Sequence, residues 1–504
     1  MKVLTAQEMR EVDRKTSALG IPGIVLMENA AHRVVEVLAQ RYAPLSAQRI
    51  VILSGKGNNG GDGLAIARQL HTRFHPAALH VVLLASPADL KGDAAANLRM
   101  LEACGCAVFH EIPPEARRAT LVIDALLGTG IAGPASGPML EGIREINGGF
   151  PDAQVVAVDI PSGLPSDTGE PVGEFARANC TVTFTAPKLG QVMPPNCDSM
   201  GELIVAPIGS APELYRHVQT EVVEPAMFRK LLAPRPRWGH KGTFGHVLVV
   251  AGSRGKTGAA ALCGTAALRA GAGLVTVASA ESAIPQIAAH TPEVMTEPLA
   301  QTAHGSIAIN ADLDKVAEGK TIIAMGPGLG RDAGIRQIVA GAVSHFEQPI
   351  VLDADGLVWD GIAAEDRVRI MTPHPGEMAR LTGKTVAEVQ NDRLAIARGY
   401  ATAHRVILVL KGQRTVIAFP DGRAWINPTG TPALGTGGTG DVLTGMISGF
   451  LAQFPAEPDL AVAAAVYLGG LAAEIGVGDL GEKCFIASDI LKYLPRAMEE
   501  CARL

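Results

Sequence analysis

The sequence predicts an α/β protein built on parallel sheets. Short, continuous apolar runs alternate with alanine-rich stretches of helical length along nearly the whole chain of 504 residues. Strands of a parallel sheet are buried on both faces and are joined through helices, which gives this pattern. The predicted strands are RIVILS, LHVVLLA, LVIDALLG, VVAVDIPSG and TVTFTAP in the first two hundred residues, then HVLVVAGS, LVTVAS, IIAMGPG, IVLDADG and VILVLKG.

The alternation lapses once, in a stretch rich in Pro and Arg between residues 210 and 240. A chain of this length suffices for about two or three domains. We therefore place a boundary at about Pro225, within about 15 residues, and predict domains over residues 1–215 and 225–504. Ligands of open α/β sheets bind outside the carboxyl ends of the strands. The loops that follow the predicted strands are thus the places to look for sites.

Composition excludes several classes of function. The net charge is -6 and no Lys/Arg run interleaves with aromatic residues, so we expect no nucleic-acid partner. The N-terminal MKVLTAQEMREVDRK turns charged too early for a signal peptide. The uncharged run at residues 460–473 is too short to span a bilayer, so we expect a buried helix and no membrane association. Seven scattered cysteines without a CxxC spacing predict a reduced, cytoplasmic chain.

A glycine-rich loop, SGKGNNGGDG, follows the first predicted strand. It satisfies GxGxxG over residues 55–60 and precedes a helical run, LAIARQL. A dinucleotide fingerprint would also need an acid at the end of the next strand, which is lacking. The carboxylate lies inside the loop instead, at Asp62, next to Asn58 and Asn59. These residues suit phosphate oxygens or a hard cation; a tight turn in which Asn and Gly supply positive φ is the alternative.

Two further strand ends in the first half carry acids. Asp124 ends LVID and precedes the loop ALLGTGIAGP, and Asp159 ends VVAVD, three residues before Ser162. A carboxylate at the end of a buried strand is costly to desolvate unless a partner compensates it. Three such loops on neighbouring strands predict a polar crevice.

The motifs LMENA (residues 26–30), GNNGGDG, DALLGTGIAGP and VDIPSG occur in this order. Over residues 1–215 the chain resembles the N-terminal domain of the bifunctional NAD(P)H-hydrate repair enzymes. The resemblance implies a Rossmann-like three-layer domain that epimerises the R and S forms of hydrated NADH and NADPH (NADHX and NADPHX). It implies Asp159 as the catalytic acid/base and a potassium site at Asn59, Asp124 and Ser162. The implied substrate-binding residues are Asn58, Asn59, Gly60, Gly61, Asp62, Gly128, Thr129, Gly130, Ile131, Ala132, Gly133, Pro134 and Asp159.

The second half has its own candidate phosphate loops. HVLVVAGSRGKTGAA is not a Walker motif, because that spacing requires glycine where Val250 stands. In GTGGTGDVLTG, backbone N–H groups of residues 437–440 can converge, and a helix starting near Val442 would add its positive end. Asp441 is placed to accept a proton from a hydroxyl nucleophile. The alternative is that Asp441 only caps the helix.

Other strand ends of the second half supply polar partners. GPGLGRD, LDADGL, TPHPGE and LKGQRT all follow apolar strands. His374 stands between two prolines, as a ligand contact or a surface-turn histidine. Lys411 could contact a phosphate as a point charge. Asp353 and Asp355 could hold magnesium through water or simply order their loop.

GPGLG, TPHPGE, LKG and NPTGTPALGTGGTGD together make residues 225–504 similar to the C-terminal domain of the same enzymes. The resemblance implies a ribokinase-like α/β domain, an ADP-dependent NAD(P)HX dehydratase that uses Mg²⁺. It implies Asp441 as the catalytic base. The implied substrate contacts are Ala259, Gly328, His374 and Asp441, and the implied contacts to the nucleotide (ADP or AMP) are Lys411, Gly412, Gln413, Arg414, Thr415 and Gly440.

The leading hypothesis is one cytoplasmic enzyme that epimerises NAD(P)HX in its first half and dehydrates the S form in its second. Its partners would be NADHX, NADPHX and ADP, and we expect a homo-oligomer. The main alternative is a ribokinase-like kinase for a small molecule, such as a vitamin precursor, because an anion loop and a base would look the same. In that case the first half would be a non-catalytic nucleotide-binding module.

Overall fold

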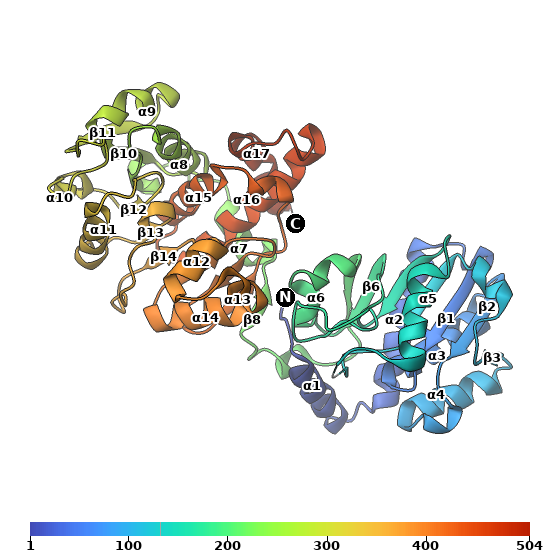
Figure 1. Cartoon of the computed structure of the whole chain (residues 1–504). Helices are drawn as coiled ribbons and strands as arrows, with labels where there is room; N and C mark the ends of the chain where they lie inside the picture. The colour runs from blue at the N-terminus through green and yellow to red at the C-terminus, as the bar shows by residue number, and fades with distance from the viewer. Residues whose placement is uncertain (132, 504) are drawn as a thin grey trace. The chain divides into compact units, whose positions relative to one another are not determined.

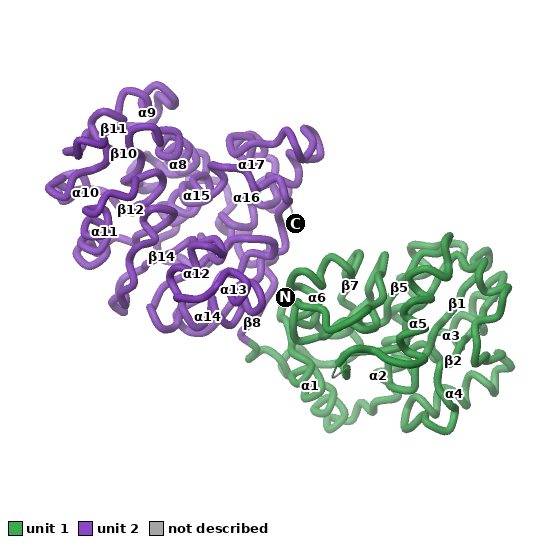
Figure 2. Tube along the Cα trace, in the orientation of Figure 1, with its two compact units in different colours: residues 1–218 green, residues 219–504 purple. Residues whose placement is uncertain are grey.

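The computed structural model describes residues 1–131 and 133–503, so Ala132, one of the expected substrate contacts, lies outside the described residues. The chain divides into two compact units, Met1–Val218 and Gln219–Leu504 (Figure 2). Each unit contains a mainly parallel sheet with helices around it, so the predicted α/β fold class is confirmed.

The first unit contains a sheet of seven described strands in the order β3-β2-β1-β4-β5-β6-β7. Every pair of neighbouring strands in it is parallel. The strands are β1 (Arg49–Ser54), β2 (Ala78–Leu83), β3 (Val108–Phe109), β4 (Leu121–Ala125), β5 (Gln154–Val158), β6 (Cys180–Phe184) and β7 (Glu202–Ala206). The α-helices are α1 (Ala6–Ala18), α2 (Gly23–Arg41), α3 (Asn58–Arg73), α4 (Gly92–Ala103), α5 (Gly137–Gly148) and α6 (Leu189–Val192).

Alternating side chains of these strands build two cores, one on each face of the sheet. Ile50 and Ile52 of β1 belong to the cluster that includes the apolar faces of α2, α3 and α4. Val51 and Leu53, which point the other way, pack in the cluster that includes Ile143 of α5. Because successive residues of a strand face opposite sides, continuous apolar strands produce the three layers that are visible in Figure 1.

The second unit contains a sheet of ten described strands in the order β11-β10-β9-β12-β13-β14-β15-β16-β17-β8. Only β16 runs antiparallel to its neighbours in this described sheet. The strands are β8 (Thr220–Val222), β9 (His246–Val250), β10 (Leu274–Ala280), β11 (Met295–Leu299), β12 (Ile322–Met325), β13 (Ile350–Leu352), β14 (Arg369–Met371), β15 (Ile407–Leu410), β16 (Val416–Ala418) and β17 (Ala424–Ile426).

The α-helices of this unit are α7 (Pro225–Phe228), α8 (Thr257–Arg269), α9 (Ile284–His290), α10 (Leu313–Ala317), α11 (Gly334–His345), α12 (Pro375–Thr382), α13 (Val386–Asn391), α14 (Arg393–His404), α15 (Thr439–Gln453), α16 (Pro458–Leu480) and α17 (Ala487–Arg503). Its largest core joins one face of the sheet to α8, α15, α16 and α17. The helix α14 packs against β15 and β16.

The apolar run at residues 460–473 lies in α16, which is longer than the sequence suggested. Its 23 residues are long and apolar enough to cross a membrane by length and composition. However, 67% of its most apolar window is buried inside the unit, where it packs against α15 and α17. The helix therefore serves as a core helix of this fold.

Six described strands, β3, β7, β8, β11, β16 and β17, were not predicted from the sequence, and three differences in element boundaries bear on the domains and sites. The strand β8 lies in the stretch without alternation and joins the second sheet next to β17, so this unit begins at Gln219. The helix α3 begins at Asn58, inside the glycine-rich loop, and α15 begins at Thr439 instead of near Val442. Short strands and glycine-rich first turns give weak periodic signals, which explains these differences.

Glycines bring α15 into close contact with α8. A Cβ atom on Gly445 would lie 2.1 Å from the carbonyl oxygen of Cys263. We expect Gly445→Ala to lower the free energy of unfolding of the second unit by about 1 to 3 kcal/mol, because the overpacked helices must separate. Gly399→Ala is the control, since Gly399 is exposed in α14 and a Cβ there meets no atom within 4 Å. It should stabilise the unit by up to about 1 kcal/mol. Equal denaturant midpoints for the two variants would contradict this packing account.

Candidate functional sites

In the first unit, the glycines of NNGGDG serve close packing. The residues Asn58 to Gly63 form the first turns of α3 and none has a positive φ, so the turn interpretation of this loop is wrong. A Cβ atom on Gly60 would lie 1.8 Å from the carbonyl oxygen of Gly55, and one on Gly61 would lie 2.8 Å from the side chain of Met27. The helix can therefore begin directly against the end of β1, with its N-terminus at the carboxyl edge of the sheet.

The three residues of the expected potassium site meet at the end of β4. Asp124 is fully buried, and its Oδ1 and Oδ2 accept hydrogen bonds from Ser162 Oγ (2.5 Å) and Ser162 N (2.8 Å). Asn59 Nδ2 donates to the carbonyl oxygen of Leu127, and Leu127 N donates to Ser162 Oγ at 2.8 Å. The Oδ1 atom of Asn59 is buried and no described residue donates to it. Burial raises the pKa of Asp124 to about 6, although its hydrogen bonds from Ser162 oppose the rise.

This donor set fits a hard cation, the class to which K⁺ belongs. A buried carboxylate, an amide oxygen without a donor and a hydroxyl oxygen are hard ligands of the kind that alkali and alkaline-earth ions prefer. A cation beside Asp124 would also compensate its buried charge.

The expected substrate loop, residues 128–134, follows this cluster. A Cβ atom on Gly128 would lie 3.2 Å from Cβ of Asn59, so this end of the loop lies against α3. Thr129 accepts a hydrogen bond from Ser166 through its carbonyl oxygen. Added Cβ atoms on Gly130 and Gly133 would meet nothing within 4 Å, Ile131 is half-buried and Pro134 is exposed. The described part of the loop is thus open at its centre.

Asp159 lies at the end of β5 with a strained backbone. Its φ of 64° is in the left-handed region, which is unusual for a residue other than glycine. The backbone is held by a hydrogen bond from Asp159 N to Val182 O (2.8 Å) and by one from Gln191 Nε2 to Asp159 O (2.5 Å). Lys188 Nζ donates to Oδ1 of the carboxylate at 2.6 Å, and Thr183 Oγ1 donates to the same oxygen at 2.9 Å.

Two further acids lie near this pair. Burial and the neighbouring charges of Asp159 and Asp13 hold the pKa of Asp62 well above its ordinary value. Burial raises the pKa of Asp13, on α1, to about 6, against the influence of Lys188. Of the residues around Asp159, only Asp62 was singled out from the sequence, and Asp13, Thr183 and Lys188 were not. For Lys188 a weaker signal existed, since it follows the end of β6 by four residues, as Lys411 directly follows β15.

In the second unit, a buried ion pair lies at the carboxyl edge of the sheet. Lys411 Nζ, after β15, donates to Asp353 Oδ1, after β13, at 2.8 Å. Thr372, which follows the intervening strand β14, donates to the same oxygen at 2.7 Å. Burial alone would raise the pKa of Asp353, but the Lys411 ammonium and these hydrogen bonds outweigh it and hold the pKa below its ordinary value.

The GTGGTGD stretch begins α15 next to this pair. The N-cap is Gly438, with a φ of 95°, and Asp441 is the third residue of the helix, so the interpretation of Asp441 as an N-cap is wrong. A Cβ on Gly440 would lie 3.2 Å from Lys411 Nζ and 3.5 Å from Asp353 Oδ2. Burial and the charge of Asp353 raise the pKa of Asp441 to about 6. The first N–H groups of the helix have no partner within it, so the helix presents donors beside a carboxyl group.

His374 is the N-cap of α12. Its Nδ1 accepts hydrogen bonds from the backbone N–H groups of Gly376 (3.0 Å) and Glu377 (3.3 Å). The side chain of Glu377, which the sequence analysis did not single out, lies 3.5 Å from His374 Nε2 and 4.0 Å from Lys411 Nζ. Since 56% of the His374 side chain is exposed, its ring remains accessible to a ligand beside the Lys411 pair.

Gly328, in the loop after β12, lies against Ala259 in the first turn of α8. A Cβ on Gly328 would lie 3.2 Å from Cβ of Ala259 and 2.9 Å from the carbonyl oxygen of Lys256. Lys256 Nζ, just before α8, donates to Asp355 at 2.9 Å. Because the charge of Asp355 also influences Asp441, the glycine loops after β9 and β12 border the same edge as α15.

The expected nucleotide loop, residues 411–415, joins β15 to β16. Arg414 donates to the carbonyl oxygen of Pro428, and Thr415 donates to that of Gly412. A Cβ on Gly412, which has a φ of 138°, would lie 2.6 Å from the Arg393 guanidinium. Gln413 belongs to the same loop. Lys411 therefore lies directly beside Asp353 and Gly440, and residues 412–415 form the adjoining turn.

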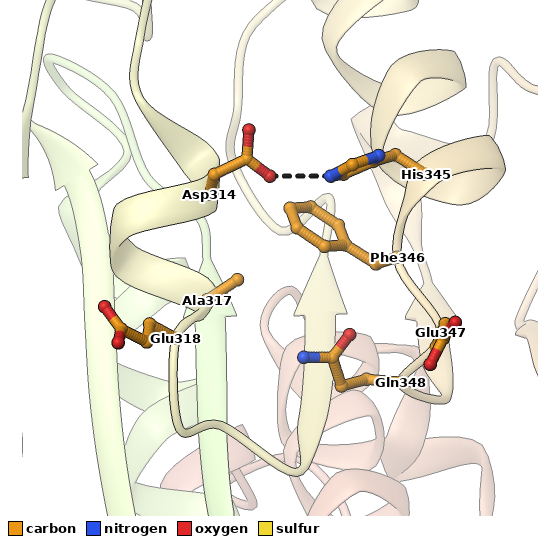
Figure 3. A pocket seen from close by; sticks show the side chains of 7 residues that line it. All are labelled: Asp314, Ala317, Glu318, His345, Phe346, Glu347 and Gln348. Carbon is orange, nitrogen blue, oxygen red and sulfur yellow. Dashed lines mark hydrogen bonds and ion pairs between the residues drawn. The ribbon is translucent and has the colours of Figure 1, made fainter.

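A surface hollow elsewhere in this unit lies outside the site. It is bordered by α10, the end of α11 and the residues just before β13, and a hydrogen bond of 2.7 Å joins His345 to Asp314 across it (Figure 3). These segments precede β12 and β13, so the hollow lies at the amino ends of the strands. Its lining residues are Asp314, Ala317, Glu318, His345, Phe346, Glu347 and Gln348.

Two family models match the chain. One, described as YjeF-related protein N-terminus, matches residues 23–190, and the other, described as NAD(P)H-hydrate dehydratase, matches residues 247–496. The bifunctional NAD(P)H-hydrate repair enzyme of Moorella thermoacetica is 42% identical over 99% of this chain and 98% of its own length. That of Thermofilum pendens is 37% identical over 99% of this chain and 96% of its own length.

The chain belongs to the family of bifunctional NAD(P)H-hydrate repair enzymes. A crystal structure of the ADP/ATP-dependent NAD(P)H-hydrate dehydratase from Bacillus subtilis, obtained with ATP and Mg²⁺, covers 56% of this chain and 98% of its own. It is 38% identical, with a TM-score of 0.52. The resemblance that the motifs indicated is therefore confirmed over both halves of the chain.

The buried pair Lys411–Asp353 should also stabilise the second unit. The Asp353 side chain is 2% exposed, so Lys411→Met leaves an uncompensated carboxylate inside the protein. We expect this to lower the free energy of unfolding by about 3 kcal/mol. Lys230→Met, which removes an exposed lysine from its pair with the partly exposed Glu457, should change it much less. Equal losses of stability in denaturant titrations of the two variants would show that the buried pair contributes no more to the free energy of unfolding than an exposed pair.

Proposed function

We propose that this protein repairs hydrated nicotinamide cofactors by two successive reactions. The first unit interconverts the R and S forms of NADHX and NADPHX. The second unit dehydrates the S form with ADP and releases NAD(P)H, AMP and phosphate. The observation that carries the proposal is the pairing, at each sheet edge, of a strand-end acid with a lysine, Asp159 with Lys188 and Asp353 with Lys411. Membership of the repair-enzyme family supports it.

In the second unit, Asp441 acts as the general base. It takes the proton of the hydroxyl on carbon 6 of the hydrated ring while that oxygen attacks the terminal phosphorus of ADP and AMP leaves. Phosphate then departs from carbon 6, and loss of the neighbouring proton restores the ring double bond. Lys411 and the N–H groups at the start of α15 bind the phosphoryl oxygens, on which negative charge is spread during transfer. Gly440 keeps the space beside Lys411 free of a side chain.

The two glycine loops around Ala259 and Gly328 would hold the hydrated dinucleotide, with His374 on the opposite side. Small residues let backbone atoms approach a ligand closely. The turn made by Gly412, Gln413, Arg414 and Thr415 would hold the adenine nucleotide, so that Lys411 lies between the two ligands. This assignment rests on the positions of these residues along the same sheet edge.

In the first unit, Asp159 would serve as the acid/base. Residues Asn58 to Asp62 at the start of α3 and the loop 128–134 would bind the substrate, whose phosphates suit a helix N-terminus. One placed carboxylate can take the hydroxyl proton while the bond between carbon 6 and the ring nitrogen breaks and its electron pair moves onto that nitrogen, which leaves a flat aldehyde carbon. When the bond re-forms on the other face of this carbon, the carboxyl group returns the proton to the oxygen and the other epimer results. Asn59, Asp124 and Ser162 would hold K⁺, which would compensate the buried charge of Asp124.

Magnesium would enter the second unit together with the nucleotide. No three described His, Cys, Asp or Glu side chains converge as a dedicated metal site. That is the usual situation for Mg²⁺, which proteins bind through one or two carboxylates and the phosphates of a substrate. Asp353 and Asp355 lie at the appropriate edge. A homo-oligomeric state and a cytoplasmic location stay predictions.

The proposal predicts that both epimers of NADHX are converted. In a mixture of the epimers with ADP, Mg²⁺ and K⁺, we expect the NADH absorbance to return in full, with release of free phosphate. Replacing K⁺ by tetramethylammonium should slow only the phase that depends on epimerisation. Conversion of the S form alone would leave only the dehydratase, and a product that keeps its phosphate would favour a small-molecule kinase.

The pKa of Asp441 predicts a pH dependence for the second reaction. Only the ionised carboxylate can accept the hydroxyl proton, so activity should fall as the pH is lowered through about 6. We expect kcat/KM for the S epimer to drop about tenfold per pH unit below that value. Asp441→Asn should abolish dehydration at every pH while epimerisation, measured by chromatography, continues. An acid limb near the ordinary pKa of aspartate would contradict the role of a buried base.

A further inference from the structure

Lys188 is one of the least exposed charged residues of the first unit. It lies four residues after β6 and is 1% exposed. Its ammonium group donates to Asp159 Oδ1 (2.6 Å), Thr183 Oγ1 (2.8 Å) and Phe184 O (3.2 Å). An ammonium has three protons, and these contacts use all of them. Lys188 therefore has no donor left for a substrate, and any effect on catalysis must pass through Asp159.

The contacts of Asp159 divide its two oxygens into different roles. Oδ1 accepts hydrogen bonds from Lys188 and Thr183, whereas no described side chain or backbone group is bonded to Oδ2. The carboxylate is 15% exposed, so it reaches the surface of the site. The left-handed backbone of Asp159, held by Gln191 and Val182, fixes where the side chain starts. Oδ2 is thus the atom that remains for a ligand.

Several acids surround the Lys188 ammonium. Asp159 follows β5, Asp62 lies on α3 and Asp13 lies on α1; the charges of Asp159 and Asp13 act on Asp62, and that of Asp159 acts on Asp13. The Oδ1 atom of Asp13 is buried and no described residue donates to it. In such a cluster, carboxylates compete for protons unless a cation compensates one of them. Lys188 makes its direct ion pair with Asp159, so Asp159 is the acid whose charge it compensates.

We propose that Lys188 is a positioning residue of the epimerisation site: it binds Oδ1 of Asp159, compensates the charge of that carboxylate beside Asp13 and Asp62, and leaves Oδ2 to take the hydroxyl proton as the bond between carbon 6 and the ring nitrogen breaks and to return it when that bond re-forms. The inference rests on the proposed epimerase function. Thr183 assists through the second hydrogen bond to Oδ1. The lysine thereby sets both the orientation and the charge of the group that moves the proton.

The test uses the full chain carrying Asp441→Asn, so that epimerisation is observed without dehydration. The rate of conversion of purified R epimer is followed by chromatography from about pH 5 to about pH 9. Variants are Lys188→Met, Lys188→Arg and Thr183→Val. Lys91→Met, which removes an exposed lysine of the same unit, is the matched control. Rates are normalised to the folded fraction from thermal unfolding.

We expect Lys188→Met to lower kcat at pH 7 by about 30-fold or more and to move the acid limb of the pH profile upward by about one unit, with KM little changed. Lys188→Arg keeps the charge and should leave the acid limb in place even where kcat falls. Thr183→Val should lower kcat by about three- to tenfold without moving the limb. Lys91→Met should behave as the parent.

Wild-type kcat and an unmoved acid limb in Lys188→Met would overturn the inference. If that variant does not fold, the other two variants provide the test. Thr183→Val with the kcat of the parent, or Lys188→Arg with a shifted acid limb in its pH profile, would overturn the inference. Failure of the proposed function has a different signature, because the parent chain would then not interconvert the epimers at all. A parent that epimerises, with Asp159→Asn inactive and Lys188→Met unaffected, rejects only the role of Lys188.

Discussion

A carboxylate at the carboxyl end of a buried parallel strand must be compensated, and both units depend on this constraint. Lys188 pairs with Asp159 at 2.6 Å in the first, and Lys411 pairs with Asp353 at 2.8 Å in the second. In each case the lysine directly or closely follows a strand of the same sheet, and a threonine on or directly after a neighbouring strand donates to the same carboxylate oxygen. The pairs cost desolvation and are retained where orientation and charge of an acid matter.

Asp441, which has no direct ion pair with a described residue, differs from Asp353 in its pKa. Asp441 has a pKa raised to about 6 through burial and the charge of Asp353, whereas the pKa of Asp353 is held low. Neighbouring carboxyl groups whose pKa values are pushed apart commonly divide structural and catalytic roles between them. The arrangement favours Asp353 as the fixed charge that holds Lys411 and Asp441 as the group that exchanges a proton. Gly440 keeps the space beside Lys411 free of a side chain, whereas the glycines at the start of α3 serve close packing.

The sequence predicted the α/β class and most of the strand ends that carry polar residues, because apolar strands and the acids that follow them are local patterns. It did not predict where helices start in glycine-rich segments: α3 begins at Asn58 and α15 at Thr439, since glycine weakens the periodic signal. It also missed β8, which has three residues, and the contact between Lys188 and Asp159, which are 29 positions apart. Contacts of that kind depend on which strands become neighbours, and short local patterns do not contain this information.

The central claim is that two separate sites act in sequence on the same damaged cofactor. It is tested most directly by supplying purified R-NADHX, ADP, Mg²⁺ and K⁺ to two variant chains, Asp159→Asn and Asp441→Asn, each alone and then mixed. We predict no early NADH from either chain alone beyond the spontaneous rate, and recovery of NADH when they are mixed, because the S epimer made by one chain diffuses to the other. Recovery by either chain alone, or none from the mixture, would contradict the claim.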